Sequence, residues 1–120
     1  MKALVVDDSL VMRKILVDTL SRAGILDVSQ AGDGEQAVKL ATSEPFDIIL
    51  LDWHMPKMTG IEALKEMRAR GLTMPIVMVT TEAEKIRIIE ALQAGADNYI
   101  IKPFRAEEVA VKIQEILAGV

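Results

Sequence analysis

Cysteine is absent from the chain, which excludes a disulfide framework and any metal site built on thiolates. Aromatic residues make up only 3% of the sequence, so a buried core has to be built from aliphatic side chains and methionine. Basic residues are in deficit, with 14 Lys and Arg against 18 Asp and Glu and a net charge of −4. A nucleic-acid groove needs clustered Lys and Arg, so we expect no nucleic-acid partner.

Long hydrophobic runs are missing as well. The run at residues 48–51 is far shorter than the roughly 20 apolar residues of a membrane-spanning helix. The run at residues 3–6 stops at Asp7 and lacks the length and cleavage site of a signal peptide. We therefore expect a cytoplasmic protein with no membrane association. Its 120 residues, of which 51% are hydrophobic, fit a single domain over residues 1–120 with one sizeable core.

What the sequence does contain is an alternation of short apolar segments with segments of helical period. The expected strands are residues 3–6, 28–30, 48–51, 76–80 and 99–101. The expected helices are residues 9–23, 35–43, 60–70, 83–94 and 105–117. Continuous apolar strands are typical of a parallel sheet that helices cover on both faces. We therefore expect an α/β fold, a flavodoxin-like (βα)5 doubly wound sandwich whose five-stranded parallel sheet has the common order 2-1-3-4-5.

One expected helix has an apolar face whose extent is open. In residues 83–94 this face carries Ile86, Ile89 and Leu92, and Ile88 lies off it. Single exposed apolar residues are common on protein surfaces. Ile88 is therefore either a harmless exposed residue or part of a surface that binds a partner.

Acidic residues follow two of the expected strands. Asp7 and Asp8 come after the first strand, and Asp52 comes after the third. In the expected order these strands are neighbours, and their carboxyl ends flank the point at which open α/β sheets bind ligands. Carboxylates that converge there repel one another. A hard divalent cation such as Mg²⁺ relieves that repulsion, so we expect a Mg²⁺ site.

A hydroxyl and a cation fall on the same edge of the sheet, because Thr80 ends the fourth strand and Lys102 ends the fifth. A metal ion and a lysine neutralise a phosphoryl group, a hydroxyl hydrogen-bonds it, and one carboxylate acts as nucleophile. Taken singly, each residue has a plainer interpretation, such as the start of a helix for Asp7 and Asp8. Taken together, they favour a phosphoryl-transfer site.

The motifs resemble those of a known family, the response regulator receiver domains of two-component signalling. They are Asp7-Asp8, Asp52, Thr80 and Lys102-Pro103-Phe104, and segments 52–60 and 94–99 are especially similar to those of CheY-like chemotaxis regulators. The resemblance covers essentially the whole chain. It implies that a histidine kinase is the phosphodonor and that Asp52 is the phosphoacceptor. It also implies a monomer that binds a downstream protein target through its helix-4/strand-5/helix-5 face.

The same resemblance implies a metal site. Asp8, Asp52 and the backbone carbonyl of His54 would hold Mg²⁺, and Asp7 would act through water. The protein would assist its own aspartyl phosphorylation and dephosphorylation, and would not be an enzyme acting on outside substrates.

Further roles are implied for residues around the phosphoacceptor. Thr80 and Lys102 would contact the phosphoryl group, Tyr99 would be a rotameric switch, and the Lys102–Pro103 peptide bond would be cis. His54 and Glu82 occupy positions that tune dephosphorylation. Thr81 departs from the family, which usually has Ala or Gly there, and we expect it to narrow access to the phosphoryl group.

Two other functions fit parts of the pattern. A small Mg²⁺-dependent phosphatase of the haloacid-dehalogenase type also uses an Asp nucleophile, but it carries D-x-D after the first strand, and here Leu10 stands two residues beyond Asp8. An FMN-binding flavodoxin shares the fold, but its phosphate loop would be Asp7-Asp8-Ser9, which repels phosphate. Residues 32–37 match a dinucleotide fingerprint, yet they follow the second strand, so we interpret them as a turn before a helix.

Overall fold

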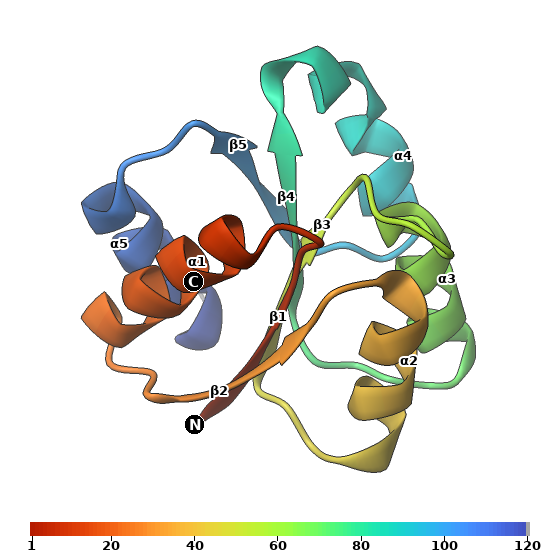
Figure 1. Ribbon diagram of the computed structural model, residues 1–120, viewed down its shortest axis with the longest axis horizontal. Helices are drawn as coiled ribbons and strands as arrows, with labels where there is room; N and C mark the ends of the chain where they lie inside the picture. Colours follow the sequence, from red (N-terminus) through yellow and green to blue (C-terminus); the bar gives the residue numbers. More distant parts are fainter. Residues whose placement is uncertain (120) are drawn as a thin grey trace.

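The structure of the protein is a computed structural model that describes residues 1–119, except the side chains of Glu82 and Lys85. Strands and helices alternate along the chain (Figure 1). The strands are β1 Lys2–Val6, β2 Asp27–Ala31, β3 Ile48–Asp52, β4 Ile76–Thr81 and β5 Asn98–Lys102. The helices are α1 Leu10–Arg22, α2 Gly34–Ser43, α3 Gly60–Ala69, α4 Ile88–Gln93 and α5 Ala106–Leu117, and a 3₁₀ segment, η1 Glu82–Arg87, precedes α4.

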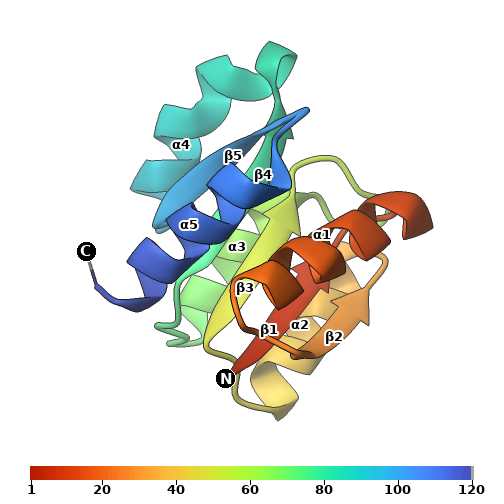
Figure 2. The same ribbon diagram turned by 90° about the vertical axis from the view of Figure 1, so that its left-hand side faces the viewer.

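The strands form one parallel sheet of order β2-β1-β3-β4-β5, which confirms the predicted topology. α1 and α5 cover one face of the sheet, and α2, α3 and α4 cover the other (Figures 1 and 2). β1 and β3 are neighbours in register, with Val6 beside Leu51. Asp7 follows Val6 and Asp52 follows Leu51, so both acids lie at the carboxyl edge of the sheet.

Two apolar clusters hold the layers together, because successive strand residues face opposite sides of the sheet. Leu4 and Ile49 belong to the cluster beneath α2, α3 and α4. Val5 and Leu50 belong to the cluster beneath α1 and α5. Burial on both faces explains the unbroken apolar runs of β1 and β3. Within residues 1–119, no helix is long and apolar enough to cross a membrane.

The region expected as helix 83–94 differs from the prediction. Its first part forms η1, and α4 begins only at Ile88. A 3₁₀ segment has about 3 residues per turn, so its side chains lose the phase that a single α-helix would keep. The expected apolar face is consequently the exposed one, with Ile86, Ile89 and Leu92 88%, 67% and 43% exposed. Ile88 is buried, so both interpretations of it as a surface residue were wrong.

Candidate functional site

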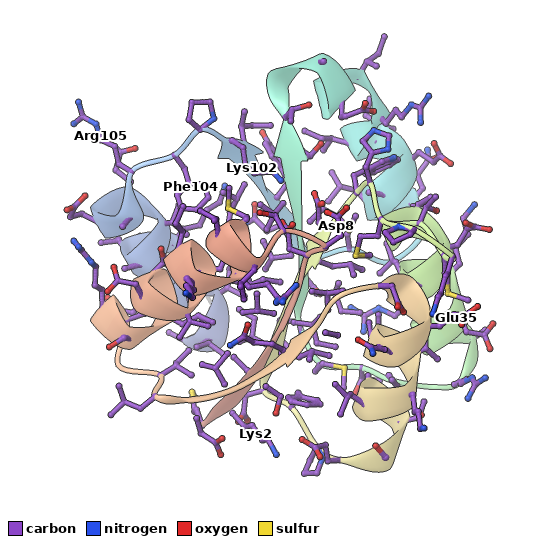
Figure 3. All side chains as sticks on the ribbon, viewed as in Figure 1. Lys2, Asp8, Glu35, Lys102, Phe104 and Arg105 are labelled. Atoms are coloured by element: carbon purple, nitrogen blue, oxygen red, sulfur yellow. The ribbon has the colours of Figure 1, made fainter. Side chains whose placement is uncertain are left out.

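Three acidic residues meet at the carboxyl edge of the sheet. Carboxylate oxygens of Asp7, Asp8 and Asp52 all lie within 4.8 Å of one another. Asp7 and Asp52 are buried, whereas Asp8 is exposed at the mouth of the site. Figure 3 shows Asp8 at this edge, where the chain passes from β1 to α1. The structure therefore brings together the acids that the sequence placed on neighbouring strands.

Asp8 is free for this role because another residue caps α1. Ser9 is the N-cap, and its Oγ accepts a hydrogen bond from the Met12 backbone N at 3.2 Å. The Ser9 backbone N in turn donates to Asp7 Oδ1 at 2.9 Å. The plainer interpretation of Asp8, as a residue whose carboxylate starts the helix, is therefore not what the structure shows.

Lys102 brings a positive charge to the acids from the edge strand β5. Its Nζ donates a hydrogen bond to Asp52 Oδ1 at 3.1 Å and lies 3.6 Å from Asp7 Oδ2. The same Asp52 oxygen accepts a hydrogen bond from the Trp53 backbone N at 2.9 Å. The Lys102–Pro103 peptide bond is cis, as the resemblance implied.

Burial raises the pKa of the Asp52 carboxyl, and the negative charge of Asp7 raises it further. The ammonium group of Lys102 and the Trp53 backbone N–H act in the opposite direction but do not cancel the effect. Without a bound cation the ionised form of Asp52 is thus disfavoured. A divalent cation at the carboxylates would remove that penalty.

Asp52→Asn is expected to flatten the pH dependence of stability in metal-free buffer. Because the folded state raises the pKa of Asp52 above its usual value of 3.8, folded protein holds this proton more tightly than unfolded protein. The free energy of unfolding therefore falls as the pH rises through the interval from the unfolded pKa to the folded pKa. Urea unfolding of both proteins with EDTA, from about pH 4 to about pH 8, measures the difference. Parallel pH profiles would contradict it.

Two buried oxygens at the site have no hydrogen-bond partner among the described residues, namely Thr80 Oγ1 and Asp7 Oδ2. Thr80 lies near the end of β4 and is 1% exposed. A buried polar group without a partner is costly, and such groups gather where a ligand or ion completes the bonding. The hydroxyl donor and the carboxylate oxygen therefore fit a site that binds an oxyanion and a cation.

The loop between β3 and α3 passes close to the site. Gly60 starts α3 and donates its backbone N–H to Trp53 O at 2.8 Å. A Cβ on Gly60 would lie only 2.0 Å from Asp52 O, so this packing requires glycine. The His54 side chain is exposed, and its Nε2 lies 2.7 Å from Glu84 Oε1. Contact with His54 lowers the pKa of Glu84.

One supporting residue was missed at the sequence level. Arg13 on α1 donates from Nη1 to the backbone oxygen of Asp7 at 2.8 Å, and from Nε to Gln30 Oε1 at 3.0 Å. It thereby ties the loop that carries Asp7 to α1 and β2. The sequence gives no signal for this role, since the contact depends on where β2 lies.

One hollow on the surface lies away from these residues. It has a volume of about 670 Å³ and is lined by residues 41–47 and 71–75 at the amino ends of β3 and β4. Its lining does not include Asp7, Asp8, Asp52, Thr80 or Lys102. Chemistry, rather than the size of the hollow, therefore locates the candidate site.

Comparison with known proteins identifies the family. Residues 3–114 match the response regulator receiver domain, so the chain belongs to the response regulator receiver family. It is 46% identical over 120 residues to the chemotaxis protein CheY homolog of Campylobacter jejuni, covering 98% of this chain and 92% of that protein. The chain is thus a phosphorylation-dependent response regulator of the chemotaxis type, and the phosphatase and flavodoxin alternatives are not favoured.

Solved structures agree with this assignment. Chemotaxis protein CheY4 of Vibrio cholerae has a TM-score of 0.86 at 37% identity, covering 96% of this chain and 97% of that one. The receiver domain of the sensor histidine kinase PA1611 of Pseudomonas aeruginosa has a TM-score of 0.85 at 32% identity, with coverage of 99% and 98%. That structure holds a magnesium ion in its active site cleft.

Proposed function

We propose that Asp52 accepts a phosphoryl group from the phosphohistidine of a kinase, and that the modified protein binds a downstream target. The observation that carries this proposal is the arrangement around Asp52. Lys102 Nζ contacts its Oδ1 at 3.1 Å, two further carboxylates adjoin it, and the hydroxyl of Thr80 has no hydrogen-bond partner in the described part of the chain. These groups match the charge and hydrogen-bonding needs of a phosphoryl group.

Mg²⁺ fits the acidic part of the site. The ligands would be the carboxylates of Asp8 and Asp52 and the backbone carbonyl of His54, with Asp7 acting through water. The buried Asp7 Oδ2, for which residues 1–119 as described offer no hydrogen-bond partner, supports a cation here, and so does the all-oxygen donor set. When bound, the ion neutralises charge on the carboxylates and on the phosphoryl group.

In the transfer step, a carboxylate oxygen of Asp52 attacks phosphorus and the P–N bond of the donor breaks. The bonding electron pair returns to the imidazole nitrogen of the donor. Lys102 compensates negative charge on the phosphoryl oxygens, and the Thr80 hydroxyl donates a hydrogen bond to one of them. The later hydrolysis of the acyl phosphate restores Asp52, so the protein modifies only itself and is not an enzyme with outside substrates.

Residues around the site are proposed to set the access to the phosphoryl group on Asp52 and the lifetime of that group. His54 is exposed beside Asp52, and its contact with Glu84 links the loop after β3 to η1. Thr81 is also exposed, as a residue that narrows access would be. The side chain of Glu82 lies outside the described residues, so its role in dephosphorylation stays a prediction.

Output is proposed to run from Thr80 through Tyr99 to the face formed by α4, β5 and α5. The phosphoryl group would draw the Thr80 hydroxyl inward and leave space for the ring of Tyr99, which is half-buried here. The exposed apolar side chains of α4 and of Val111 on α5 support this face as the one that binds the target. Residues 1–120 are proposed to act as one receiver domain and as a monomer.

Asp8→Asn is expected to weaken Mg²⁺ binding while it stabilises the protein in EDTA. Asn removes one of three charges that repel each other at close range, and Ser9 continues to cap α1. Loss of a ligand should cost at least the roughly 10–100-fold in affinity that loss of a supporting group costs metal sites. Mg²⁺ should consequently stabilise wild type by mass action and Asp8→Asn much less.

Urea unfolding of both proteins with EDTA and with excess Mg²⁺ measures these effects. Asp27→Asn is the matched control, because it removes one exposed acidic charge at the opposite edge of the sheet. It should respond to Mg²⁺ as wild type does. An Asp8→Asn protein that is less stable than wild type in EDTA and is equally stabilised by Mg²⁺ would refute the metal site.

A further inference from the structure

Lys112 on α5 makes two contacts with Tyr99 on β5. Its Nζ donates a hydrogen bond to the backbone oxygen of Tyr99 at 2.6 Å and lies 4.8 Å from the centre of the Tyr99 ring. β5 is an edge strand, so the backbone groups on its outer side have no neighbouring strand to pair with. One ammonium group therefore satisfies a backbone carbonyl and attracts the aromatic ring of the same residue.

These contacts join the two faces of the sheet. Val109 and Ile113, which flank Lys112 on α5, belong to the cluster beneath α1 and α5. Tyr99 packs against the other cluster, beneath α2, α3 and α4. The side chain of Lys112 therefore reaches around the edge of β5, and it links the position of the ring to the position of α5.

The surroundings strengthen the attraction. Burial lowers the pKa of the Lys112 ammonium group, and the negative charge of Glu115 offsets part of this effect. The ammonium group has thus lost part of its water shell beside Tyr99. The attraction between a cation and an aromatic ring increases as the cation loses water. The contact between Lys112 and Tyr99 is therefore stronger than the same contact between two fully exposed side chains.

We propose that Lys112 is a positioning residue that holds the Tyr99 ring where this structure has it, and so sets how readily the ring moves on phosphorylation of Asp52. The second half of this statement rests on the proposed switch role of Tyr99. A ring that leaves this position gives up its contact with the ammonium group. The contact therefore adds to the free-energy difference between the two ring positions, and its removal reduces that difference.

A single label can test this, because the chain contains one tyrosine. Incorporation of meta-fluorotyrosine places one fluorine on Tyr99 for NMR. Lys112→Met removes the charge and the hydrogen-bond donors but keeps an unbranched side chain, whereas Lys112→Arg keeps both. Lys14→Met, at an exposed position of α1, is the matched control for the loss of one positive charge.

Without a phosphoryl mimic, fluorine relaxation is expected to show a more mobile ring in Lys112→Met than in wild type. In a titration with beryllofluoride and Mg²⁺, half of the fluorine response should occur at a concentration about three- to tenfold lower than in wild type. Lys112→Arg should restore both values, and Lys14→Met should leave both unchanged. Urea unfolding verifies that each variant is folded.

A Tyr99 ring that is as immobile in Lys112→Met as in wild type would overturn the positioning role. If half of the fluorine response occurs at the same beryllofluoride concentration in all variants, the proposed influence of Lys112 on switching is overturned. If beryllofluoride leaves the fluorine spectrum of wild type unchanged while Lys112→Met still frees the ring, Lys112 keeps its positioning role. In that case the switch role of Tyr99 is what fails. Release of the ring in Lys112→Arg as well would also overturn the inference, because it would assign the effect to shape rather than to charge.

Discussion

Acetyl phosphate is expected to add one phosphoryl group to the protein in the presence of Mg²⁺ and none in EDTA, and Asp52→Asn is expected to abolish the addition. Asp52 carries the oxygen that Lys102 contacts at 3.1 Å, and burial together with the charge of Asp7 raises its pKa. A cation would offset the negative charge of the neighbouring carboxylates and of the incoming phosphoryl group, so the dependence on Mg²⁺ should be close to complete. Intact-mass spectrometry counts the phosphoryl groups.

Two other acidic residues, one inside the site and one far from it, provide the controls for this experiment. Asp7→Asn leaves Asp52 in place, so it should slow labelling without changing the labelled residue. Asp27→Asn changes an exposed acid at the opposite edge of the sheet and should label as wild type does. Full labelling of Asp52→Asn would show that another residue is the phosphoacceptor. Full labelling of wild type in EDTA would show that no metal is needed.

Gly60→Ala is expected to destabilise the fold by about 3 kcal/mol or more, which is a large part of the stability of a small domain. The new Cβ would lie 2.0 Å from Asp52 O and 3.0 Å from Trp53 Cα. Both are backbone atoms, so no side-chain rotation relieves the overlap. Alanine is favoured over glycine in a helix by about 1 kcal/mol, which is too little to offset the clash. Urea unfolding measures the loss.

Gly71→Ala separates this clash from ordinary glycine effects. Gly71 has a φ of +84°, but a Cβ there would meet nothing within 4 Å. Its replacement should therefore cost only the roughly 1–2 kcal/mol of a left-handed backbone with a side chain. Because Gly60→Ala also displaces the backbone of Asp52, it alone should weaken Mg²⁺-dependent labelling. Equal losses of stability in the two variants would contradict the steric explanation.

Much of the fold followed from local pattern. The apolar runs of β1 and β3 predicted buried strands, and glycine or proline after most helices predicted their ends, because side-chain period and backbone preference act over a few residues. Strand order rested on the common folds of this class rather than on these residues. Once that order is given, β1 and β3 are neighbours and their carboxyl ends lie at the same edge of the sheet. Asp7 and Asp52 must then lie close together.

The sequence itself therefore determined that the acids, Thr80 and Lys102 lie at one edge of the sheet. Each of them stands at the end of an apolar strand, and a parallel sheet aligns these ends. Only the tertiary structure decided which side of residues 82–94 faces the core, because the 3₁₀ segment breaks the helical phase there. It also decided the contact of Lys112 with Tyr99, since the two residues belong to different elements and meet around a sheet edge. Contacts of that kind depend on how separate elements are placed relative to one another, which no local period encodes.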